Sequence, residues 1–188
     1  MNIRNLSMMA LLFPLLAGCF PLVATGVGAG VAMIEDRRST GAYVDDQSIE
    51  LKAGGRISEK LKDEVHINVT SFNRNVLLTG EAPSEKHKAD AERLVMSVPN
   101  VRSISNEIAI AGASSLGSRS NDALLTSKVK GRFFDAGKFY ANHVKVVTEN
   151  GVVYLIGLVK QKEAEDAKVI ASSTGGVQKV VTVFEYLD

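Results

Sequence analysis

The segment HINVTSFNRNVLLTG, residues 66–80, decides the fold because a closely similar pattern follows as HVKVVTENGVVYLIG at residues 143–157. Both segments begin with His and end with Gly after the same number of residues. In each, apolar side chains surround a short polar stretch, a pattern typical of half-buried strands joined by a turn. Each segment is therefore predicted to form a β-hairpin, with turns at residues 73–75 and 149–151.

The similarity continues on both sides of the hairpins. Corresponding residues of the two hairpins are 77 positions apart in the sequence, whereas corresponding flanking residues are 76 positions apart. The one-residue difference falls in the turn after Gly80 and Gly157. We expect the second strand of each hairpin to end at these glycines, in a left-handed or crowded turn. A repeat of this length indicates a duplicated domain. The matching upstream positions are Asp46, Ile49, Ala53 and Ile57 in the first copy and Asp122, Leu125, Val129 and Phe133 in the second.

Each copy is predicted to contain a helix, two strands, a second helix and a third strand. The four-residue spacing from Ile49 to Ile57 favours a helix with Asp46 as its N-cap, and Asp122 takes that place in the second copy. Residues 91–98 have the apolar spacing of a core-facing helix. We expect an α+β fold in which each copy packs a three-stranded mixed sheet on two helices.

The N-terminus has the features of a secretory signal. Arg4 precedes the apolar run Met8–Leu16, which is too short to span a bilayer, since spanning takes about 20 residues. Leu16-Ala17-Gly18-Cys19 resembles the lipobox of bacterial lipoproteins, in which the Cys is acylated and becomes the first residue. A plain signal peptide with an incidental Cys is the alternative.

Cleavage before Cys19 would leave 170 residues with equal numbers of basic and acidic side chains. The uncharged residues 20–34 could serve as a tether. By resemblance to enterobacterial lipoproteins, Phe20 in place of an Asp implies sorting to the outer membrane. Because Cys19 is the sole Cys of the sequence, an intramolecular disulfide is excluded.

The order of elements, with a Gly closing the second strand, resembles the BON domain. A lipobox before two such domains resembles the outer-membrane lipoproteins of the DolP type, as do the stretches Asp36–Gly41 and Val146–Gly151. OsmY-like proteins share the domains but lack the anchor. The expected organisation is a signal peptide at 1–18, acylated Cys and tether at 19–44, BON domains at 45–112 and 119–188, and a linker at 113–118.

The sequence offers little for catalysis. There is no Gly-x-Ser-x-Gly motif and no pair of His residues at metal-ligand spacing. His66 and His143 share one repeat position, which favours a structural role, and His87 is expected to be solvated. We expect no enzyme activity, no metal and no cofactor beyond the diacylglycerol and N-acyl chains on Cys19. A net charge of +1 excludes a strongly basic nucleic-acid binder.

The start of the second domain is the basic part of the chain. Residues 119–134 hold four basic side chains and one acidic one. On a helix that buries Leu125, Val129 and Phe133, apolar side chains would lie outward beside lysines, a pattern of interfacial membrane contact. A solvated basic face is the alternative. The family resemblance implies anionic-phospholipid binding by this helix, at the positions of Leu124, Ser127, Lys128, Lys130, Gly131 and Phe134.

Leu124 departs from the family pattern, in which a Trp is expected.

The resemblance implies a non-enzymatic lipoprotein on the periplasmic face of the outer membrane that binds phosphatidylglycerol or cardiolipin. It further implies recruitment to the division site, envelope integrity and support of peptidoglycan-hydrolase activation through amidase regulators. The alternative is an adaptor that binds the outer-membrane assembly complex. The first domain, residues 45–110 with 9 basic and 11 acidic side chains, is expected to be a docking surface or structural partner.

Overall fold

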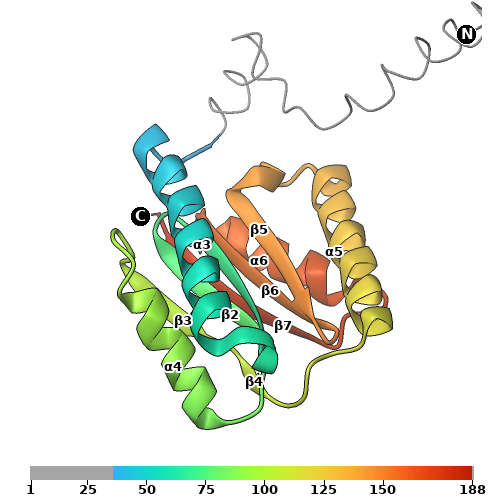
Figure 1. Ribbon diagram of the computed structural model, residues 1–188. Coiled ribbons are helices and arrows are strands. Elements are labelled where there is room, and N and C mark those ends of the chain that lie inside the picture. The colour runs from blue at the N-terminus through green and yellow to red at the C-terminus, as the bar shows by residue number, and fades with distance from the viewer. Residues whose placement is uncertain (1–35, 188) are drawn as a thin grey trace, which may run out of the picture. The chain divides into compact units, whose positions relative to one another are not determined.

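The computed structural model describes residues 36–187, which fold into two successive domains (Figure 1). The first domain begins with a long helix and carries a short 3-10 turn before its hairpin. Its elements are α3 (Thr40–Leu61), β1 (His66–Phe72), β2 (Asn75–Ala82), α4 (Glu85–Met96), β3 (Ser103–Asn106) and β4 (Ala109–Ile110).

The second domain repeats this order with one unbroken last strand. Its elements are α5 (Leu116–Ala136), a 3-10 turn (Ala141–His143), β5 (Val144–Glu149), β6 (Val152–Val159), α6 (Gln161–Ser172) and β7 (Lys179–Tyr186). The predicted duplication and the α+β class are therefore confirmed.

Both sheets are mixed, as predicted. In each, the hairpin strands are antiparallel and the last strand runs parallel to the second hairpin strand. The last strand of the first domain is interrupted between β3 and β4, where the Ile108 N–H donates to Asn106 Oδ1. The interruption buries the side chain of Ile108 in the core, and the sheet resumes at Ala109.

The first helix of each domain begins earlier than the apolar pattern indicates. Ser39 caps α3 by accepting a hydrogen bond from the Ala42 N–H, and Ser115 caps α5 by accepting from the Ser118 N–H. Helical structure therefore includes residues 40–44, which the sequence assigned to the tether, and the end of the predicted linker.

The prediction that Asp46 and Asp122 cap helices is wrong. Both lie inside their helices, where they are buried. The Asp46 carboxylate accepts from the backbone N–H groups of Asn73 and Arg74, in the turn of the first hairpin. The Asp122 carboxylate accepts from the N–H groups of Asn150 and Gly151, both at 2.9 Å. Each Asp therefore pins the hairpin turn of its own domain to the first helix.

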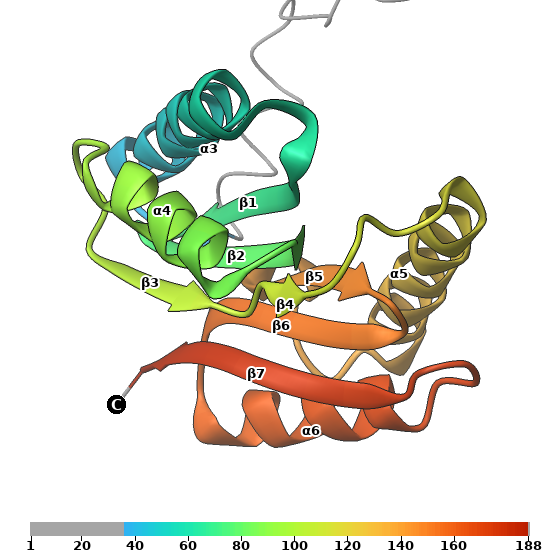
Figure 2. The same ribbon diagram turned by 60° about the horizontal axis from the view of Figure 1, so that its bottom comes forward.

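The described chain has three apolar clusters, one within each domain and one that joins the two domains. One fills each domain between its helices and its sheet. The third lies between the sheets, where Phe72 and Leu77 of the first domain pack with Tyr154, Ile156 and Leu158 of the second. Figure 2 shows α3 and α4 on one side of the two sheets and α6 on the other, with α5 beside β5. Each sheet is therefore covered by helices on one face and by the other sheet on the opposite face.

Polar contacts surround the apolar cluster between the two sheets. Asn68 donates a hydrogen bond to the carboxylate of Glu149, and Asn150 donates to Glu81 at 2.7 Å. The two domains are thus joined by an apolar centre and by hydrogen bonds at its margin.

Candidate functional site

Helix α5 is amphipathic, and its core face matches the prediction. Leu125, Val129 and Phe133 are buried at successive turns, and the helix ends where Gly137 adopts a left-handed conformation with φ of 58°. The ring of Phe133 packs edge-on against Phe139, with centroids 5.1 Å apart. Anchoring on this side fixes which residues of α5 face solvent.

All six predicted lipid-binding positions lie on the solvent side of α5. We call them the α5 face: Leu124, Ser127, Lys128, Lys130, Gly131 and Phe134. Leu124 is 63% exposed and Phe134 is 80% exposed, which is unusual for large apolar side chains. Between them lie the small residues Ser127 and Gly131. The Ser127 hydroxyl donates back to the Ala123 carbonyl of the same helix, and Gly131 has no side chain. Two large apolar side chains therefore project beside small residues and two lysines.

The charge of the α5 face comes from two lysines. Within residues 36–187, neither Lys128 nor Lys130 forms an ion pair, so both ammonium groups are available to a ligand. Arg132 is used differently, because its guanidinium donates to the Ile170 carbonyl and to Thr174 Oγ1. One exposed carboxylate, Asp135, follows the face and reduces its net charge.

The structure exposes further apolar side chains that the sequence pattern did not indicate. Tyr140 follows α5 with 56% of its surface exposed, and Leu116 is exposed at the start of the helix. The first domain also has such residues, because Val44 and Leu51 point outward from α3. Val44 could have been identified had the start of α3 been placed at Thr40, whereas Leu51 lies within the predicted helical span from Ile49 to Ile57. Each first helix therefore exposes apolar side chains, but two unpaired lysines accompany them on α5.

The three histidines have structural surroundings. His66 begins β1, and His143 is buried next to Tyr140, with its Nδ1 4.0 Å from Glu163 Oε1. His87 differs from the prediction that it is solvated. It is half-buried, with Nδ1 2.8 Å from Ser84 Oγ and Nε2 3.0 Å from Glu64 Oε2. Its position at the start of α4 allows it to join the helix cap to the 3-10 turn at Lys62–Glu64, which precedes β1.

Among residues 36–187, no three His, Cys, Asp or Glu side chains come together as metal ligands. None of the helices in that range is long and apolar enough to cross a membrane. Cys19 lies outside the described residues, so its predicted acylation stays a prediction.

Comparison with known proteins agrees with the duplicated architecture. The BON domain family model matches residues 45–112 and 121–188. Over 175 residues the chain is 37% identical to the outer membrane lipoprotein DolP of Haemophilus influenzae, covering 92% of this chain and 91% of that protein. It is 36% identical over 154 residues to a 21 kDa hemolysin of Actinobacillus pleuropneumoniae, covering 81% and 79%.

A more distant relative shares the domains. The osmotically inducible protein Y of Escherichia coli is 27% identical over 161 residues, covering 83% of this chain and 80% of that protein. The identity to DolP is higher and extends over nearly the whole chain. The chain therefore belongs to the BON-domain family, as a DolP-like protein with two BON domains that is lipid-anchored in the outer membrane.

Proposed function

We propose that this protein binds the anionic phospholipid surface of its membrane through the α5 face, with Cys19 carrying the acyl anchor. The observation that carries the proposal is the exposure of Leu124 and Phe134 beside two lysines without ion pairs. Apolar side chains of this kind can enter the headgroup region while the ammonium groups meet anionic lipid.

The position of α5 relative to Arg38, near the start of the described residues, supports the proposal. Lys130 lines the same surface groove as Arg38, which lies at the start of the described chain. Asp36 lies 17 positions after Cys19, and an extended chain of that length spans at most about 60 Å. An anchor at Cys19 therefore keeps the α5 face within reach of the membrane.

Leu124 stands where the family pattern has a Trp, so the aromatic contribution must come from elsewhere. Phe134 and Tyr140 are exposed at the C-terminal end of α5. Aromatic rings of this kind favour the membrane–water interface. In this protein we place the aromatic part of the contact at that end of the helix.

Two cellular consequences belong to the same proposal. A lipid-anchored protein that also reads anionic headgroups accumulates where those lipids are enriched, and this underlies our proposal that it gathers at the division site on the periplasmic face. There it would support envelope integrity and peptidoglycan-hydrolase activation, as the family resemblance implies. The lipid contact comes first in this sequence of events, so it is the step to test.

The test uses residues 20–188, which lack Cys19 and hence acyl chains, in co-sedimentation with vesicles. We expect binding to vesicles that contain phosphatidylglycerol or cardiolipin, no binding to neutral vesicles, and weaker binding as salt rises. Leu124→Glu and Phe134→Glu each remove the burial of a large apolar side chain and are expected to weaken binding about 10-fold or more.

A matched control comes from the first domain. Leu51 on α3 is 79% exposed, so Leu51→Glu makes the same chemical change on an equally accessible helix. We expect this variant to bind as the wild type does. Wild-type protein that ignores anionic vesicles at low salt would refute the lipid proposal and favour an adaptor for the outer-membrane assembly complex, to be sought by cross-linking in the envelope.

A further inference from the structure

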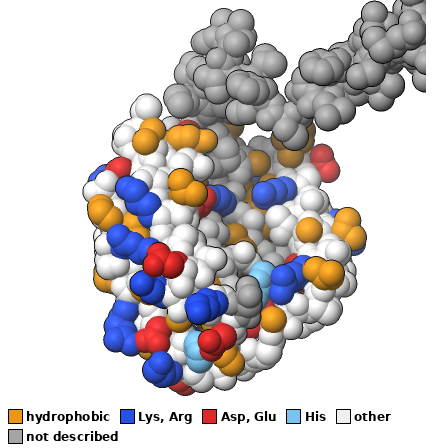
Figure 3. Space-filling model, in the orientation of Figure 1, with side chains coloured by type: hydrophobic (Ala, Val, Ile, Leu, Met, Phe, Trp, Pro, Cys, Tyr) orange, Lys and Arg blue, Asp and Glu red, His pale blue; other side chains and the backbone are white. Residues whose placement is uncertain are grey.

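A groove of about 340 Å³ lies between the two domains, beside the C-terminal half of α5. Its first-domain wall includes Arg38, Tyr43 and Gln47, and its second-domain wall includes Lys130, Asn142 and Lys145. Figure 3 shows this face of the molecule, which is hollowed between the surfaces of α3 and α5. The volume suits a small polar headgroup, since small-molecule sites usually begin at about 300 Å³.

The lining is cationic. Three of the lining side chains are Arg or Lys, and none is Asp or Glu. Arg38 is held in place by Asp36 at 2.6 Å and Asp46 at 2.9 Å, and its guanidinium lies 4.2 Å from the centre of the Phe72 ring. The two carboxylates that fix Arg38 are not themselves part of the lining.

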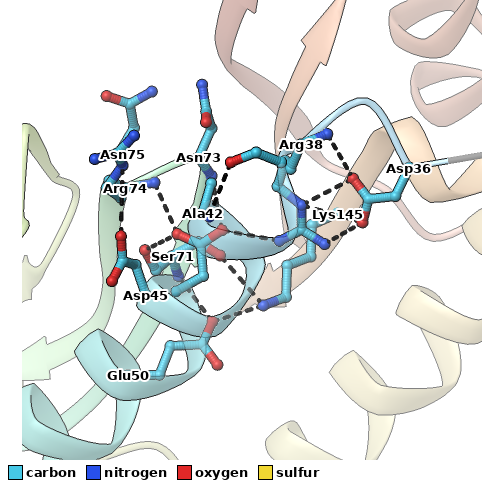
Figure 4. Close-up of polar contacts among 12 residues, drawn as sticks. Asp36, Arg38, Ala42, Asp45, Glu50, Ser71, Asn73, Arg74, Asn75 and Lys145 are labelled. Atoms are coloured by element: carbon cyan, nitrogen blue, oxygen red, sulfur yellow. Dashed lines mark hydrogen bonds and ion pairs between the residues drawn. The ribbon is translucent and has the colours of Figure 1, made fainter. Parts of the chain in front are cut away.

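The two lysines of the groove differ in their partners. Lys145 Nζ lies 2.6 Å from Glu50 Oε1, so this ammonium group is fixed from the first domain (Figure 4). Lys130 has no ion pair within residues 36–187 and is the lining cation available to neutralise a ligand. The groove is therefore suited to a single negative charge.

Neutral groups complete the lining. The side chains of Gln47 and Asn142 are exposed, form no hydrogen bond within residues 36–187, and offer amide donors from opposite walls. Phe72 and Val144 add apolar surface. This combination of one free cation, amide donors and apolar wall matches a singly charged phosphodiester joined to a glycerol backbone.

We infer that the groove binds the headgroup of one anionic glycerophospholipid, so that the first domain takes part in lipid recognition. The inference rests on the proposed function, because Lys130 belongs to both the groove and the α5 face. It adds that Gln47 of α3 and Asn142, in the turn before β5, contact the headgroup. The α5 face supplies attachment to the membrane, and the groove supplies a choice among headgroups.

The test compares two charge-introducing variants with a matched control. Gln47→Glu and Asn142→Asp place a carboxylate in the groove without changing the α5 face. Gln161→Glu makes the same change at an exposed position at the start of α6. Residues 20–188 are titrated with a short-chain phosphatidylglycerol below its micelle concentration and, separately, with inorganic phosphate, while side-chain amide NMR signals are recorded.

We expect the short-chain lipid to shift the amide signals of Gln47 and Asn142 but not those of Gln161. Each groove variant is expected to bind this lipid at least 5-fold more weakly than the wild type, and Gln161→Glu to bind equally well. Equal shifts and affinity with inorganic phosphate would overturn the headgroup assignment. Unchanged lipid affinity in both groove variants would overturn the site itself.

These outcomes are separable from failure of the proposed function. If the groove variants bind vesicles normally while Leu124→Glu does not, the α5 contact stands and the groove inference fails. If wild-type protein binds the short-chain lipid in the groove but not vesicles, the groove stands and the α5 contact fails.

Discussion

Arg37 donates two hydrogen bonds to the carboxylate of Glu163, at 2.6 and 2.7 Å, across 126 residues of sequence. The same guanidinium donates to the Leu158 carbonyl at 3.2 Å. Arg37 precedes the first helix, whereas Glu163 is in the first turn of α6, the last helix. The segment that leads from the anchor into the first domain is therefore fastened directly to the second domain.

Arg37→Ala should lower stability at neutral pH. The pair is partly exposed, so we expect a loss of about 1–2 kcal/mol, which corresponds to about 2–6 °C in Tm for a chain of this size. Thermal unfolding of residues 20–188 measures it. Arg93→Ala, which removes an exposed pair within α4, is the control and should leave Tm almost unchanged.

The effect of Arg37 should also depend on pH. Its hydrogen bonds hold the pKa of Glu163 below the usual value, and they outweigh the opposite effect of partial burial. Because the pKa is lowered, the contribution is complete above the ordinary glutamate pKa of about 4.3 and is lost as the pH falls through the lowered value. The Tm difference between wild type and Arg37→Ala should therefore shrink at acidic pH; a constant difference would mean that Arg37 acts without the Glu163 charge.

Asp46→Ala should be among the most damaging single changes. The carboxylate is fully buried and accepts hydrogen bonds from Arg38, Ser71 and two backbone groups of the hairpin turn. Removing it leaves a cation and buried donors without partners, at a cost of about 3–5 kcal/mol. Asp45→Ala is the adjacent control, since Asp45 is less buried and its nearest cation, Arg74, is 3.9 Å away. Chemical denaturation checks both variants, and similar losses would show that the hairpin turn does not depend on Asp46.

The same two aspartates show where sequence patterns stop being informative. Asp before an apolar helical run is a common N-cap signal, and the local pattern contains nothing to distinguish a cap from a buried acceptor. The backbone donors to Asp46 come from a turn about 27 residues later, so only the folded hairpin reveals its role. The true caps, Ser39 and Ser115, lie a full turn or more before the apolar run begins.

The features of the fold that could be predicted are those that follow from the periodicity of apolar residues. Alternation located both hairpins, and the four-residue spacing separated the buried Leu125 and Phe133 from the exposed Leu124 and Phe134. The groove could not be predicted, because Gln47 and Asn142 meet only when the two domains pack together. Contacts of this kind have no local sequence signal.

Gly157→Ala should destabilise the second domain. Gly157 lies inside β6 rather than at its end, and so does Gly80 inside β2, which corrects the prediction that the strands stop there. A Cβ at residue 157 would lie 2.2 Å from the His143 carbonyl oxygen, so the facing backbone would have to move. We expect a loss of about 2–4 kcal/mol by denaturant unfolding.

A glycine in open space provides the control for this change. A Cβ at Gly131 on α5 meets no atom within 4 Å, so Gly131→Ala should stabilise the helix by about 0.5–1 kcal/mol. Opposite signs for the two Gly→Ala variants are expected. If Gly157→Ala were as stable as the wild type, close approach of the two strands would not be the reason for glycine at this position.

Glu149→Gln should stabilise the protein at neutral pH. Burial raises the pKa of Glu149, and the nearby Glu81 and Asp122 act in the same direction, although the hydrogen bond from Asn68 opposes them. A raised carboxyl pKa means that the folded state binds the proton more tightly than the unfolded state does. The charged carboxylate therefore lowers stability at neutral pH, and this loss disappears as the pH falls through the raised pKa. Gln keeps an oxygen for the Asn68 amide and carries no charge. We expect Glu149→Gln to raise Tm by about 1–3 °C at pH 7.5 and to lose this advantage at acidic pH. A lower Tm for Glu149→Gln at pH 7.5 would show that the interface between the domains requires the Glu149 charge.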